Sequence, residues 1–172
     1  MYPYNLKTKN TPIIAKEKTK GSLSADRRLL ELLQMAMQEA ALLEQKYTTL
    51  LQEELLKEAE TILQTMITDE KKHQRILREI LFLLFSDTFE DILEGTETGE
   101  AETKNAEELL EELLFTEMDD ITFFRSLLSA VAGNDIDDDL WHLIFEIITD
   151  KQNHTAALNH LYAKYFTKTT VQ

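Results

Sequence analysis

The feature that most constrains this chain is a repeated string. Residues 67–73 read ITDEKKH, and residues 148–154, 81 positions further on, read ITDKQNH. The same offset pairs residues of like character well beyond the string: Leu29 with Leu110, Glu39 with Asp120, Leu63 with Ile144 and Leu77 with Leu158. Ungapped matching over most of a chain indicates an internal repeat. The sequence therefore predicts two copies of a helix pair, each with an acid in its first helix and a histidine in its second.

Composition favours helix and excludes several classes of protein. Gly and Pro number only 4 and 2, so few positions would interrupt a helix. The net charge of −14 argues against nucleic-acid binding, because a phosphate backbone would repel it. The absence of Cys excludes disulfides and thiolate metal sites. The longest apolar run, residues 80–85, is too short for a membrane span, and the N-terminus has no signal-peptide pattern.

The pattern of breakers and charges divides the chain into segments. Residues 1–22 hold five Lys and one Glu, a net charge of +4, without apolar periodicity, and we interpret them as a flexible basic arm. The remaining segments are a bundle at 23–166, made of helix pairs 24–85 and 105–166 joined by an acidic crossover 86–104, and a tail at 167–172.

Capping and turn signals set the expected helix ends. Helix 1 should begin after Ser22 or Ser24, and a turn near residues 52–53 should separate it from helix 2, which we expect over residues 55–85. Helix 3 should begin near Asn105, where Asn105 and Glu108 fit a capping box, and end at Gly133. Asp135 or Asp137 should cap helix 4.

Each expected helix has one apolar stripe with spacings of three and four, and ionisable residues interrupt every stripe. The inward sets are Leu29, Leu32, Ala36, Glu39, Leu43 and Leu50 in helix 1; Ala59, Leu63, Met66, Glu70, His73, Leu77, Ile80 and Leu84 in helix 2; Leu110, Leu113, Glu117, Asp120, Phe124, Leu127 and Val131 in helix 3; and Leu140, Ile144, Ile147, Lys151, His154, Leu158 and Leu161 in helix 4.

The length of the crossover sets the topology. About 20 residues span roughly 65 Å when extended, whereas a 28-residue helix is about 42 Å long. The crossover can therefore run the length of the bundle, which makes helices 2 and 3 parallel. The predicted fold is all-α: an up-down-down-up four-helix bundle with one long crossover between helices 2 and 3, the connectivity of ferritin-like proteins.

In bundles of that connectivity, carboxylates from helices 1 and 3 and a Glu-x-x-His motif from helices 2 and 4 surround two metal ions. Glu39 and the Glu70-Lys71-Lys72-His73 motif, with Asp69 before it, resemble the ferritin-like superfamily, in particular its rubrerythrin-type branch, over residues 25–165. The resemblance implies a metal site formed by Glu39, Glu70, His73, Asp120 and His154, with Glu117 in reserve.

The second half departs from that pattern. Lys151 stands where the second bridging Glu belongs, and Tyr47 lies seven residues after Ala40 instead of after Glu39. A protonated ammonium offers no lone pair to a metal and repels a cation beside it. Two interpretations stay open: a single-metal remnant of His73, His154 and one or two carboxylates, holding one Fe, Mn or Zn ion, or a metal-free network of ion pairs.

Two functions follow. The first is a structural or interaction protein, cytoplasmic or spore-associated, whose partners are further copies of itself or other coat or assembly proteins; small proteins with degenerate ferritin-like motifs resemble those of the spore coat of spore-forming bacilli. The second is a di-iron or di-manganese oxidoreductase or iron-handling protein. Neither interpretation involves nucleic acid or a membrane.

Overall fold

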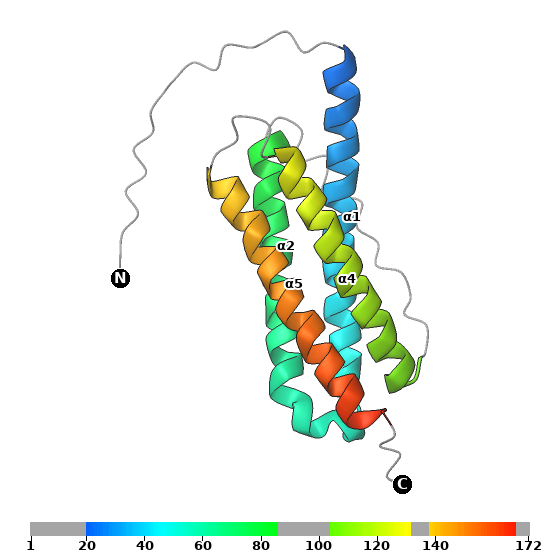
Figure 1. Cartoon of the computed structure of the whole chain (residues 1–172). Coiled ribbons are helices and arrows are strands. Elements are labelled where there is room, and N and C mark those ends of the chain that lie inside the picture. The colour runs from blue at the N-terminus through cyan, green and yellow to red at the C-terminus, as the bar shows by residue number, and fades with distance from the viewer. Residues whose placement is uncertain (1–19, 86–103, 132–137, 168–172) are drawn as a thin grey trace, which may run out of the picture.

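The computed structural model describes residues 20–85, 104–131 and 138–167 of the chain. Four long helices occupy these residues: α1 (Lys20–Leu51), α2 (Glu60–Phe85), α4 (Ala106–Val131) and α5 (Asp138–Tyr165), with a 3₁₀ helix, η1 (Glu54–Ala59), between the first two. They lie side by side as a single bundle (Figure 1). The prediction of an all-α four-helix bundle is confirmed. None of these helices combines the length and the apolar character needed to cross a membrane.

The direction of the helices also follows the prediction. α1 and α5 run from one end of the bundle to the other, and α2 and α4 run back the opposite way (Figure 1). α2 therefore ends at the end of the bundle opposite to the start of α4. The connection between them, residues 86–103, lies outside the described residues, as do most of the predicted basic arm (1–19), the expected caps Asp135 and Asp137 and the tail 168–172.

The described helix ends agree closely with the sequence signals. α1 begins at Lys20, slightly before the predicted serines, and stops at Leu51, where the turn was expected. The 3₁₀ turn then precedes α2, which begins at Glu60 and not near residue 55. At the start of α4, Asn105 Oδ1 accepts from the Glu108 amide at 3.0 Å, and Glu108 Oε2 accepts from the Asn105 amide at 3.3 Å. This is the predicted capping box.

The inward faces of three helices match their predicted stripes. Every described member of the stripes in α2, α4 and α5 is buried or half-buried. α1 differs, because its inward face is displaced by one residue in its first half. The side chains that are buried there are Leu33, Met37 and Ala40, whereas the predicted Leu32, Ala36 and Glu39 are only half-buried. The displaced stripe continues in register through Leu43, Tyr47 and Leu50.

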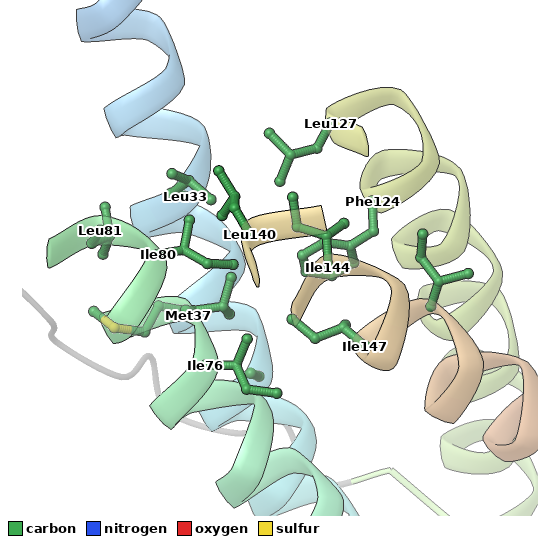
Figure 2. Close-up of a cluster of buried hydrophobic side chains, with 13 residues drawn as sticks. Leu33, Met37, Ile76, Ile80, Leu81, Phe124, Leu127, Leu140, Ile144 and Ile147 are labelled. Atoms are coloured by element: carbon green, nitrogen blue, oxygen red, sulfur yellow. The ribbon is translucent and has the colours of Figure 1, made fainter. Parts of the chain in front are cut away.

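Two apolar clusters fill the bundle. One, drawn in Figure 2, contains Leu33 and Met37 from α1 together with residues of α2, α4 and α5, including Ile80, Phe124 and Ile144. The second lies nearer the other end of the bundle, around Leu50, Leu63, Leu110 and Leu158. Between the two clusters, at the middle of α2, α4 and α5, the buried side chains are polar. Burial of the two clusters holds the four helices together and fixes the position of that polar layer.

Candidate functional site

Five polar or charged side chains are buried in the layer between the apolar clusters. Glu70 and His73 come from α2, Glu117 from α4, and Lys151 and His154 from α5, and none of them is more than 3% exposed. Burying a single charge without a partner costs several kcal/mol, so each of these groups needs compensation within the layer. The layer is therefore the candidate functional site.

Lys151 is at the centre of the layer. Its Nζ lies 2.9 Å from Glu70 Oε1, 2.9 Å from Asp120 Oδ2 and 3.3 Å from Glu117 Oε2. Its ammonium thus contacts carboxylates from two other helices, although Lys151 itself is on a third. Glu117 Oε2 has no hydrogen-bond partner among the described residues, so its approach to Lys151 is an ion pair without hydrogen-bond geometry. One ammonium compensates three carboxylates.

The two histidines pair with aspartates in a reciprocal way. His73 Nε2 of α2 donates to Asp150 Oδ2 of α5 at 3.1 Å, and His154 Nε2 of α5 donates to Asp69 Oδ2 of α2 at 3.2 Å. Each pair becomes the other when residues 81 positions apart are exchanged. On the inner side of the rings, His73 Nδ1 lies 3.3 Å from Glu70 Oε2, and His154 Nδ1 lies 3.1 Å from Glu117 Oε1.

Tyr47 and Lys72 extend the network. The hydroxyl of Tyr47, fully buried on α1, donates a hydrogen bond to Glu117 Oε1. Lys72 is 30% exposed and bridges Asp150, Asp69 and Glu146 at the rim. Sequence reasoning assigned neither residue to the site. The sequence contained a sign of each residue: Lys72 lies within the repeated string, and Tyr47 lies four residues after Leu43 on the inward face of the helix. It did not show which residues the two side chains would contact.

The surroundings shift the pKa values of these groups in directions that stabilise the charged network. Burial opposes protonation of Lys151, but the charges of Glu70, Glu117 and Asp120 outweigh it and hold its pKa well above the ordinary value. The pKa of His154 rises to about 10, because hydrogen bonds to Glu117 and Glu70 overcome the burial that would lower it. The pKa of His73 is also raised, through Asp150 and Glu70 and against burial.

The carboxylates respond unequally. Burial alone would raise the pKa of Glu70, but the charge of Lys151 and the hydrogen bonds from both histidines lower it far below its usual range. Asp150 likewise has its pKa lowered to about 2, because the groups on His73 and Lys72 outweigh its burial. Burial raises the pKa of Asp120 to about 6, and Lys151 only partly offsets that effect. At neutral pH these three carboxyl groups are thus mostly ionised.

The structure brings together four of the five predicted ligands and separates the fifth. Glu70, His73, Asp120 and His154 all join the network, and the reserve residue Glu117 is buried more completely than Asp120, whose side chain is 16% exposed. Glu39 makes no contact with Lys151. Because the inward stripe of α1 is displaced by one residue, Glu39 faces away from the centre of the bundle. It is half-buried and, like Asp120, lines a groove. Among the described residues it makes no hydrogen bond or ion pair.

Comparisons with known proteins do not identify the chain. No protein-family model, no curated protein and no solved structure matches it.

A set of possible metal ligands is nevertheless present. One ligand atom each of Glu70, Glu117 and His154 lie within 4.8 Å of one another, and a mixed set of carboxylates and imidazole suits Fe, Mn or Zn. The same two glutamates, however, contact the ammonium of Lys151. With an effective dielectric constant near 20, a divalent ion about 4 Å from an ammonium is repelled by about 8 kcal/mol. A two-metal site of the kind that the resemblance implies therefore does not fit these residues while Lys151 is in place.

Proposed function

We propose that this chain is a ferritin-like bundle in which a lysine ammonium has taken the position of a metal ion, and that it acts as a structural or interaction protein. The observation that carries the proposal is the environment of Lys151, which is 1% exposed and pairs with three carboxylates. In a two-metal bundle those carboxylates would be compensated by ions. Here a side chain of the protein compensates them.

The charges of the layer support this proposal. Five carboxylates, on Asp69, Glu70, Glu117, Asp120 and Asp150, face four cationic groups, on Lys72, His73, Lys151 and His154. With both histidines protonated the layer is within one charge of neutrality, so its carboxylates need almost no compensation from an external cation. Such a layer orients the helices and holds them in register, a role that buried polar groups have in other bundles.

The reciprocal pairs of His73 with Asp150 and of His154 with Asp69 support the internal repeat. That repeat is one of the features on which the ferritin-like proposal rests. Two copies of one helix pair, packed about an approximate two-fold axis, would make contacts of this kind. The assignment to a spore coat or to the cytoplasm, and to partners that are further copies or other coat proteins, rests on the resemblance alone and belongs to the same proposal.

Metal analysis tests the proposal directly. Protein purified without chelator, from medium containing Fe, Mn and Zn, is expected to contain well below one equivalent of any of them and to show no oxygen- or peroxide-dependent turnover. Two equivalents of Fe or Mn with such turnover would overturn the proposal and establish the alternative, a di-iron or di-manganese oxidoreductase or iron-handling protein.

A second candidate, a site for one metal ion, is favoured by one observation. Glu70, Glu117 and His154 present converging ligand atoms, and Glu117 Oε2 has no hydrogen-bond partner within the described part of the chain. Binding would require Lys151 to move away and His154 to lose a proton. Titration of the apoprotein with Zn²⁺ separates the two candidates: saturation at one equivalent with proton release supports a single-metal site, whereas no binding supports the metal-free layer.

A further inference from the structure

A groove opens between α1 and α4, on the outer side of the polar layer. Its cavity volume is about 540 Å³, within the range of pockets that bind ligands. Apolar side chains from both helices form much of its lining: Leu32, Met35, Leu42 and Phe123. Met35 is 63% exposed, so part of this apolar surface faces solvent. The groove is a consequence of the displaced stripe of α1, which leaves Leu32 and Glu39 beside the core instead of inside it.

The described residues that line the groove carry negative charge. They include the carboxylates of Glu39, Asp119 and Asp120 and no Lys, Arg or His. Asp120 is shared with the buried layer, where Lys151 compensates it. Glu39 and Asp119 make no hydrogen bond or ion pair among the described residues. An occupant of the groove should therefore combine positive charge with apolar side chains.

The chain itself contains a segment of that composition. Residues 1–19, outside the described residues, hold four Lys and one Glu, a net charge of +3, whereas the whole chain has −14. The same segment includes the apolar side chains of Leu6, Ile13 and Ile14. We propose that the groove between α1 and α4 is a docking site for residues 1–19 of the same molecule.

The geometry of attachment favours docking within one molecule. Residue 19 directly precedes α1, and Leu32 lies 12 residues into that helix, about 18 Å along its axis. An extended segment of 19 residues reaches about 60 Å, so it can turn back and cover the groove. Tethering of this kind gives an effective concentration in the millimolar range, which allows weak charge pairs to produce a populated docked state. This inference does not depend on whether the buried layer binds metal.

The absence of cysteine makes a direct test possible in the full chain. Spin labels are attached through Asn10→Cys in the N-terminal segment and Gln45→Cys on the exposed side of α1, and the distance distribution between them is measured. We expect a short-distance population in the parent. Glu39→Gln with Asp119→Asn should reduce the ratio of docked to undocked molecules roughly 2- to 30-fold, as expected for the loss of two charge pairs in a groove open to solvent. Glu53→Gln with Glu79→Gln makes the same change of charge at exposed positions outside the groove and should leave the ratio unchanged.

Three results would overturn the inference. The first is a distance distribution that responds equally to the groove variant and to its control, which would indicate a general effect of net charge. The second is the absence of any short-distance population in the parent. The third is the same population in a dilute mixture of singly labelled molecules, which would assign the groove to the N-terminal segment of a second copy. Synthetic peptide of residues 1–19, added well above the millimolar effective concentration of the tethered segment, should displace the labelled segment and deplete the short-distance population.

Discussion

The two helix pairs, α1 with α2 and α4 with α5, bring nearly the same groups to the centre of the bundle and differ decisively at one position. Asp69 and His73 of α2 correspond to Asp150 and His154 of α5, and their contacts are reciprocal. Glu70, however, corresponds to Lys151, and these two side chains meet at 2.9 Å. Where a symmetrical layer would place two like charges together, this one has an ion pair. One position thus decides whether the layer compensates itself or requires a cation from outside.

The first helices of the two pairs differ as well. α4 directs both Glu117 and Asp120 to Lys151, whereas none of the described side chains of α1 brings a carboxylate to it. The position 81 residues before Glu117 is Ala36, and Glu39, 81 residues before Asp120, lies in the wall of the groove. In place of a carboxylate, α1 contributes the hydroxyl of Tyr47. The carboxylates that pair with Lys151 of α5 therefore come from α2 and α4.

The largest effect should come from removing that cation. Lys151→Met keeps most of the side-chain volume but leaves three carboxylates without their ammonium, and breaking a buried charge network costs about 3–5 kcal/mol. We expect the free energy of unfolding, measured with urea, to fall by that amount. The matched control is Lys57→Met, at a lysine whose side chain is 73% exposed, which should change stability by less than about 0.5 kcal/mol. Equal effects of the two substitutions would contradict the role of Lys151 in compensating the buried carboxylates.

The reciprocal pairs should respond similarly, but not identically. Asp69→Asn and Asp150→Asn each weaken a charged hydrogen bond to a histidine, an interaction of about 1.5–3 kcal/mol when both partners are buried and less here, because the aspartates are 23% and 17% exposed. Asp150 also forms the closer of the two pairs with Lys72, so its substitution should cost more. Urea unfolding of both variants checks the order. A large loss in one variant with none in the other would contradict the equivalence of the two halves.

Stability should fall on the alkaline side. The pKa of His154 is about 10 in the folded protein against an ordinary value of 6.5, so its stabilising contribution is complete below about pH 6.5 and is lost as pH rises through about 10. The slope should approach 1.4 kcal/mol per pH unit for one proton. Urea unfolding between pH 6 and 9 measures it. His154→Gln should flatten the profile, whereas His160→Gln, at an exposed histidine, should not. A parent profile already as flat as that of His154→Gln would contradict the assignment.

Tyr47→Phe should have the smallest effect. It removes the hydroxyl that donates to Glu117, but His154 still donates to the same carboxylate oxygen. The expected loss is about 1 kcal/mol, the usual contribution of one hydrogen bond. Tyr162→Phe is the control, because that hydroxyl bonds to Glu111 at the surface. A loss above about 3 kcal/mol for Tyr47→Phe would mean that the layer depends on α1 as strongly as on α5.

The sequence predicted the central layer better than its periphery. Glu70, His73, Lys151 and His154 lie on stripes with a spacing of three and four. In the central turns of α2 and α5 the intervening positions, such as Lys71 and Gln152, are polar, so only one face could be buried there. α1 has apolar residues at adjacent positions, such as Leu32 with Leu33 and Ala36 with Met37, and periodicity alone does not choose between the two faces. The choice depends on packing against α2 and α4. That is why Glu39 was expected at the centre and lies in the groove.

The hydrogen bonds between histidines and aspartates of different helices could not be predicted from the sequence for a related reason. Asp69 and Asp150 were visible in the repeated string, but their histidine partners are 85 and 77 residues away. Such contacts depend on the separation and rotation of whole helices. The repeat shows which residues are equivalent. That each histidine pairs with the aspartate of the other copy is visible only in the three-dimensional structure.

The most direct test of the central claim is Lys151→Glu, examined with and without metal. This substitution restores a second Glu-x-x-His motif. In the parent, three carboxylates share one ammonium, whereas the variant has four carboxylates and no ammonium at the same place. In metal-free buffer the melting temperature should fall, because the loss of a buried partner costs about 3–5 kcal/mol and repulsion adds to it. With Fe²⁺, Mn²⁺ or Zn²⁺ at a thousandfold excess over Kd, binding to the folded state contributes about 4 kcal/mol, so the variant should recover by far more than the parent gains. A melting temperature that ignores both the substitution and the metal would contradict the claim that Lys151 stands in for a metal ion.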